Sequence, residues 1–176
     1  MCLRFLLAAL TAAFLAGCGR EAGWYPVPGQ QSLDLGFDPG GVGPAVKMDD
    51  ADAGDYIIRD IVGAPGTWRW TLIHPELRFR VWKTEALHFT AQINIAEQTF
   101  RVTGPVAVSY AVDGKQLGKI QCDHPGTYEI DTPVPAGWVP AGRYVHVTFE
   151  TDKHWVSPSD GAQLSFLLFR AGFGSK

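Results

Sequence analysis

The chain has 176 residues, of which 46% are hydrophobic, so it is long enough to form one globular domain with its own core. Its formal net charge is −3, because 18 acidic residues outnumber 15 Lys and Arg. A weakly acidic chain without a basic stripe is poorly suited to bind a phosphate backbone, which argues against nucleic acid as a partner.

The first 18 residues have the pattern of an export signal. Arg4 provides a positive charge, and residues 5–15 are apolar except for Thr11. This run is shorter than a membrane-spanning helix but matches the apolar region of a signal peptide. It ends in Leu15-Ala16-Gly17-Cys18, an aliphatic residue and two small residues before a cysteine.

This tetrapeptide resembles the lipobox of bacterial lipoproteins. The resemblance implies that residues 1–17 are a signal peptide, that cleavage occurs before Cys18, and that fatty acyl chains on Cys18 hold the mature protein on a membrane. The alternative is an ordinary secretory signal that contains a cysteine by chance. In many Gram-negative bacteria an Asp directly after the lipidated cysteine retains a lipoprotein in the inner membrane. This chain has Gly19 at that position, so we expect it to be anchored in the outer membrane. The sequence leaves open whether the domain faces the periplasm or the cell surface.

Cysteine usage then limits how the domain is stabilised. Cys2 leaves with the signal peptide and Cys18 carries lipid, so Cys122 is the only free thiol expected in the mature chain. No internal disulfide can form, and the core must stabilise the domain unaided.

Residues 18–54 are rich in Gly and Pro, which predicts an irregular lipid-anchored tether. Trp24, Tyr25 and Phe37 are more apolar than a pure linker requires, so part of the tether could also pack on the domain.

The densest group of carboxylates lies where the predicted tether ends. Its members are a candidate for a structural calcium site, because calcium binds oxygen ligands: Asp49, Asp50, Asp52 and Asp55. They lack the glycine and glutamate placement of a known calcium loop. We therefore favour a solvated acidic turn, and predict no cofactor.

From residue 55 to residue 176, short apolar runs alternate with polar residues at a period of two and end at Gly, Pro or Asp. About nine strands are predicted, near residues 56–62, 68–72, 77–82, 87–95, 106–112, 119–122, 128–130, 145–149 and 164–169. No run has the period of a long helix. The pattern predicts an all-β domain, a two-layer antiparallel β-sandwich of the jelly-roll kind.

Two connections between the predicted strands can be examined further. Asp113-Gly114 is suited to a tight hairpin turn. The runs 77–82 and 87–95 either form a hairpin, in which Trp82 faces His88, or lie in different sheets. Residues 133–140 contain three prolines and predict a surface loop that carries Trp138.

The sequence shows no catalytic constellation. It lacks both Gly-x-Ser-x-Gly and Ser-x-x-Lys. Cys122 and His124 are close enough to suggest a Cys/His nucleophile, but a strand-end cysteine beside a turn is the simpler interpretation. The five histidines show no zinc-ligand spacing. We therefore predict that the protein is not an enzyme.

A possible binding surface is suggested by Trp82, which falls on the polar side of its run. If the runs 77–82 and 87–95 form a hairpin, six residues share one face: Arg78, Arg80, Trp82, His88, Gln92 and Asn94. An aromatic ring among hydrogen-bonding side chains is typical of a glycan or peptide surface. The alternative is that each tryptophan belongs to the core, where Trp is usually found.

Three stretches resemble a group of known proteins: residues 70–80, residues 123–138 and residues 152–170. They resemble uncharacterised exported β-sandwich proteins of soil bacteria such as acidobacteria, and more loosely the jelly-roll modules attached to glycan-active enzymes. The resemblance covers residues 55–173 and implies a fold, but no binding residue, because sandwiches host many functions.

The leading hypothesis is a non-catalytic envelope lipoprotein whose sandwich binds a glycan or another envelope component. The alternative is a structural or assembly lipoprotein that docks on a protein partner, and an enzyme comes third. Exposed tryptophan among polar side chains would favour the first, and a contiguous apolar patch of several hundred Å² would favour the second.

Overall fold

The computed structural model describes residues 41–176. The predicted signal peptide, Cys18 and residues 18–40 of the predicted tether lie outside the described residues. These described residues form one compact unit. A search of the described part of the chain finds no helix with the length and apolarity needed to cross a membrane.

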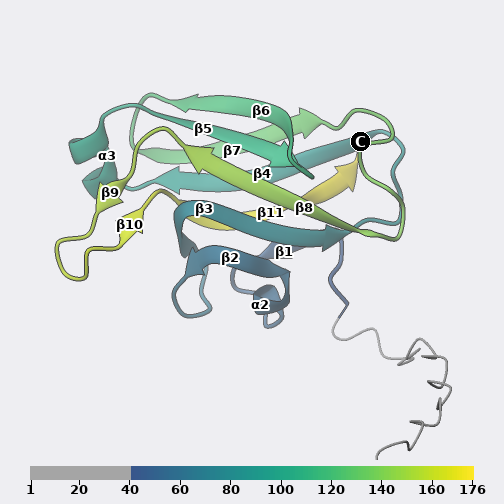
Figure 1. Ribbon diagram of the computed structural model, residues 1–176, viewed down its shortest axis with the longest axis horizontal. Helices are drawn as coiled ribbons and strands as arrows, with labels where there is room; N and C mark the ends of the chain where they lie inside the picture. The colour runs from purple at the N-terminus through teal and green to yellow at the C-terminus, as the bar shows by residue number, and fades with distance from the viewer. Residues whose placement is uncertain (1–40) are drawn as a thin grey trace, which may run out of the picture. The chain divides into compact units, whose positions relative to one another are not determined.

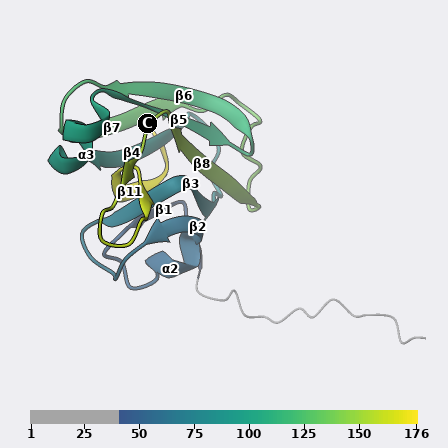
Figure 2. The same cartoon turned by 60° about the vertical axis from the view of Figure 1, so that its left-hand side comes forward.

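The predicted all-β antiparallel sandwich is confirmed. One layer has the strand order β6 (Lys115–Cys122), β5 (Val106–Val112), β8 (Tyr144–Thr151), β3 (Arg69–Arg80) and β2 (Ile57–Val62). The other has the order β7 (Gly126–Pro133), β4 (Leu87–Ile95), β11 (Leu167–Ser175) and β1 (Ala45–Lys47). The start of β11 joins the layers, because Leu167 and Leu168 also pair with β3. Figures 1 and 2 show these strands from two sides.

Three short features complete the described fold. A separate hairpin consists of β9 (Trp155–Val156) and β10 (Gln163–Leu164). The two short helices are α2 (Ala53–Tyr56) and α3 (Glu97–Thr103). Neither helix was predicted, since four and seven residues are too few to show a helical period.

The core lies between the inner faces of the two layers. The Phe89 ring on β4 lies 5.8 Å from that of Tyr110 on β5 and 6.0 Å from that of Phe149 on β8. At another point the ring centroids of Phe79 on β3 and Phe173 on β11 are 5.6 Å apart. Because side chains alternate along a strand, the neighbours of these residues face outward, away from the opposite layer.

The sandwich begins earlier than residue 55, the predicted boundary. Val46 is buried, and β1 pairs with β11 so closely that a Cβ on Gly172 would lie 2.4 Å from the Cα of Ala45. Met48 is also fully buried. Residues 42–54 therefore belong to the domain, although a strand of three residues gives no readable alternation in the sequence.

The predicted runs 68–72 and 77–82 belong largely to a single strand, β3, which passes through Pro75. Pro75 has no paired residue on β2 or β8, since pairing with β8 begins only at Glu76 and pairing with β2 is irregular here. The Asp60 carboxylate instead accepts the His74 N–H, at 3.1 Å. The missing N–H of Pro75 therefore removes no ladder hydrogen bond.

The structure also decides the two predicted connections. Asp113 and Gly114 both have positive φ, 46° and 75°, and join β5 to β6 in the predicted hairpin. The runs near residues 77 and 87 lie in different layers, as the alternative prediction had it. Beyond Pro133 the segment that carries Trp138 forms a loop.

Candidate functional site

The six predicted site residues are divided between the two layers. Arg78 and Arg80 face outward on β3, and Trp82 follows that strand. The other three face outward on β4 of the opposite layer: His88, Gln92 and Asn94. The single face expected from a hairpin is therefore not formed, because alternation shows which side of a strand faces the core but not which sheet the strand joins.

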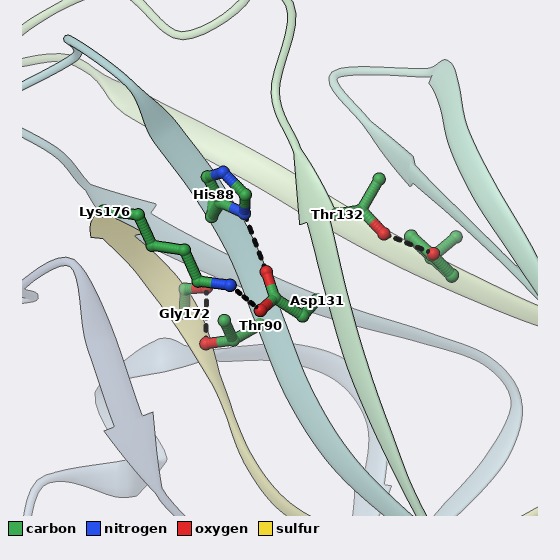
Figure 3. Close-up of polar contacts among 7 residues, drawn as sticks. His88, Thr90, Asp131, Thr132, Gly172 and Lys176 are labelled. Atoms are coloured by element: carbon green, nitrogen blue, oxygen red, sulfur yellow. Dashed lines mark hydrogen bonds and ion pairs between the residues drawn. The ribbon is translucent and has the colours of Figure 1, made fainter.

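The three residues on β4 make polar pairs with β7. The pairs are His88 with Asp131 at 2.7 Å, Gln92 with Glu129 at 2.6 Å and Asn94 with Thr127 at 3.0 Å. In Figure 3 the Asp131 carboxylate lies between His88 and Lys176. Hydrogen bonds from Lys176 and His88 hold the pKa of Asp131 below its ordinary value. Cross-strand pairing thus accounts for the polarity of this face without a ligand.

On the other layer, Arg78, Arg80, Trp82 and Tyr144 form a row that we name the Trp82 patch. Tyr144 on β8 is paired with Arg80 on β3. The Arg80 Cζ lies 4.5 Å from the centroid of the Trp82 ring and 5.8 Å from that of Tyr144, and the Arg78 Cζ lies 5.6 Å from the Tyr144 ring. Guanidinium groups and aromatic rings therefore alternate, an arrangement stabilised by cation–π attraction.

The backbone around residue 142 holds the Trp82 patch in place. Arg80 Nε donates to the carbonyl oxygen of Gly142 at 2.8 Å, and the Gly142 N–H donates to that of Val81 at 2.7 Å. Gly142 has φ 72°, and a Cβ there would lie 2.6 Å from Cζ3 of Trp82. A residue without a side chain is therefore required for the indole to lie this close to the loop.

The aromatic side chains of the patch are open to solvent. Trp82 is 62% exposed and Tyr144 is 43% exposed, although large aromatic residues are mostly buried in folded domains. Trp82 also borders a hollow of about 560 Å³, whose wall includes Lys83 and the C-terminal Lys176. This volume lies within the range of small-molecule sites, and the Lys83 ammonium group is a hydrogen-bond donor on its wall.

Sequence reasoning missed Tyr144 and Gly142. Tyr144 precedes the predicted run 145–149 on its polar side, so the same alternation that selected Trp82 could have found it. The role of Gly142 could not be read from the sequence, because it depends on contact with a residue 60 positions away in the chain.

The remaining predicted sites are not assembled. Asp50 accepts the Lys47 N–H at 2.8 Å within a turn, and residues 41–176 contain no group of three His, Cys, Asp or Glu placed to hold a metal ion. Cys122 is fully buried, whereas the His124 ring is stacked on Tyr128 at the surface. Burial, with Asp123 and Asp152 acting in the same direction, raises the pKa of Cys122 to about 11. A buried neutral thiol does not suit a nucleophile.

No family model matches this chain, and no curated protein matches it. Among solved structures, an exo-β-1,3-galactanase from Phanerochaete chrysosporium has a TM-score of 0.42 at 10% identity, over 75% of this chain and 29% of that one. The C-terminal family 6 carbohydrate-binding module of LamC, a laminarinase from Zobellia galactanivorans, has 0.37 at 11% identity, over 73% and 98%. A family 35 carbohydrate-binding module from an environmental isolate has 0.34 at 17% identity, over 80% and 96%.

This chain spans less than a third of the galactanase, and also less than a third of two further similar enzymes, an acetyl xylan esterase from Butyrivibrio proteoclasticus and a 4-O-methyl-α-glucuronidase. Similarities at this level say nothing about ligand or activity, so a proposed function must be based on the geometry of the site.

Proposed function

We propose that this protein is a non-catalytic lipoprotein of the bacterial cell envelope whose β-sandwich binds a glycan through the Trp82 patch. The observation that carries the proposal is the exposed Trp82 ring, which Arg80 and Gly142 hold in place outside the core. An exposed indole beside hydrogen-bond donors suits a sugar, which has both an apolar C–H face and hydroxyl groups.

On this proposal, separate groups of the patch bind separate parts of a sugar. The exposed area of Trp82 and Tyr144 provides a platform for a sugar ring. Arg78 is oriented by donating its Nε–H to the carbonyl oxygen of Asp55 at 2.8 Å, so its planar head group has a set direction for pairing with hydroxyls or a carboxylate. Because these side chains are already ordered, binding loses less conformational entropy.

The proposal is tested by affinity electrophoresis of the full-length chain in a detergent without a sugar head group. The native gels contain hydroxyethylcellulose, laminarin, xylan or polygalacturonate, and sedimentation with peptidoglycan covers an insoluble envelope glycan. We expect at least one polymer to bind the parent. Trp82→Ala should weaken that binding about thirtyfold, the effect of losing an anchor worth about 2 kcal/mol.

Two further variants serve as controls. Trp82→Phe keeps an aromatic ring and should retain part of the binding, whereas His124→Ala removes an exposed ring outside the patch and should change nothing. Full binding by Trp82→Ala would show that this patch is not the site. Unfolding of Trp82→Ala would show that the ring has a structural role, which also contradicts the proposal.

A further inference from the structure

A second group of tryptophans lies near the start of β3. Trp70 lies between Trp68 and Trp155, with ring centroids 6.3 Å from each of them. Trp68 is 44% exposed, and the other two are half-buried. We name these three residues the Trp68 patch. Trp155 belongs to β9, so the patch is assembled from segments more than 80 residues apart in the chain.

A hollow of about 500 Å³ lies beside this patch. Its wall consists of Val62 at the end of β2, residues 63–64 and 66–67 of the turn that follows, and Trp68, Arg69 and Trp70. Arg69 is only 8% exposed, and its Nε finds no hydrogen-bond partner among the described residues. A buried donor without a partner is costly, and most such groups in folded proteins are satisfied.

The two patches lie at opposite ends of one strand and on the same side of it. Trp70, Arg78 and Arg80 alternate with buried residues along β3, so all three face outward. Ten residues separate Trp70 from Arg80, which corresponds to about 33 Å at the usual rise of a strand. In Figure 1, β9 lies beside the start of β3, whereas the C-terminus lies toward its other end.

The surface between the patches is polar. Glu76 faces outward at the middle of β3, where its carboxylate contacts Arg59 at 2.9 Å and His146 at 2.7 Å. Charged groups are depleted at the centre of protein–protein interfaces, so the ion pairs around Glu76 make this surface poorly suited to dock a protein. A polysaccharide can cross such a surface, because the hydroxyl groups of the sugars between the patches stay hydrated there, whereas the two patches supply the binding contacts.

We propose that the Trp68 patch is a second glycan site and that the two patches hold one extended polysaccharide chain along the outward face of β3. This inference rests on the proposed function of the Trp82 patch. A polysaccharide bound at one patch raises the effective concentration of its own sugar units at the second patch. A polymer that reaches both patches therefore binds more tightly than a short sugar binds at either patch, commonly by a factor of about 10²–10⁴.

The test compares long and short forms of the same sugars on the full-length chain in detergent. The polymers are hydroxyethylcellulose, laminarin, xylan and polygalacturonate, and the trisaccharides are cellotriose, laminaritriose, xylotriose and trigalacturonic acid. Trp68→Ala and Trp82→Ala should each weaken binding of the polymer at least tenfold. Equilibrium dialysis should find two trisaccharides bound to each parent molecule and one to each variant, with His124→Ala unchanged.

The outcomes separate this inference from the proposed function. If Trp82→Ala loses binding while Trp68→Ala keeps it, with one trisaccharide per parent molecule, the second site does not exist and the first one stands. If neither the polymers, the trisaccharides nor peptidoglycan bind the parent, both proposals fail. Should Trp68→Ala unfold, Trp68→Phe decides: weaker polymer binding at an unchanged unfolding midpoint supports the second site, and unchanged binding overturns it.

Discussion

At the scale of the residue, the exposed indole of Trp82 depends on a glycine far from it in the chain. Gly142→Ala places a methyl group where the Trp82 ring lies, so we expect it to displace the ring and weaken glycan binding at least tenfold. Gly137→Ala is the matched control, because Gly137 has a similar φ of 79° with nothing within 4 Å of the added Cβ.

Both glycine variants should lose stability, by about 1–2 kcal/mol for a side chain in the left-handed region. Only Gly142→Ala should lose binding, as measured by affinity electrophoresis beside thermal unfolding. Equal binding by the two variants would mean that the position of the ring does not matter to the ligand.

The buried thiol of Cys122 gives a prediction in alkaline solution. Its pKa is about 11 in the folded protein and 9.0 when unperturbed, so its contribution to stability is complete below pH 9 and is lost as the pH rises toward 11. Relative to Cys122→Ala, the parent should lose about 2–3 kcal/mol across that interval. Denaturant unfolding at several pH values measures this difference.

The same thiol should be unreactive toward iodoacetamide at pH 8 in the folded chain and should react once the chain is denatured. Rapid alkylation of the folded protein would contradict the burial argument.

At the scale of the element, alternation predicted most strands, but not the layer that each one joins. The residues of β4 show the limit clearly, because His88, Gln92 and Asn94 have the pattern of an open polar face. Only the position of β7 beside β4 shows that they pair with side chains on that strand. The runs 68–72 and 77–82 were likewise predicted separately. The alternation could not show that they form one strand through Pro75, because this depends on where β3 changes neighbours.

The end of β11 provides a prediction about such pairing. Lys176 and His88 hold the pKa of Asp131 below its ordinary value of 3.8, so the ionised carboxylate stabilises the fold above that pH. Asp131→Asn should therefore lower the unfolding midpoint at pH 6. The difference from the parent should disappear as the pH falls through the lowered pKa, and a constant difference at all pH values would contradict this role.

At the scale of the whole molecule, export and anchoring are proposals from the sequence, because Cys18 lies outside the described residues. Cys18→Ser should abolish incorporation of an alkyne-labelled palmitate analogue in a bacterial host, since the thiol that receives the lipid is removed. Cys122→Ala is the control and should be labelled like the parent. Equal labelling of Cys18→Ser and the parent would contradict the lipoprotein proposal.

The most direct test of the glycan proposal follows the indole N–H signals of the ¹⁵N-labelled chain during titration with cellotriose, laminaritriose, xylotriose and trigalacturonic acid. The Trp82 signal is identified by its absence from Trp82→Phe, and Trp138 serves as an internal reference, since its ring contacts Lys115 outside the patch. We predict that at least one sugar shifts the Trp82 signal in a saturable manner and leaves that of Trp138 unchanged. A Trp82 signal that stays fixed with every sugar would contradict the proposal.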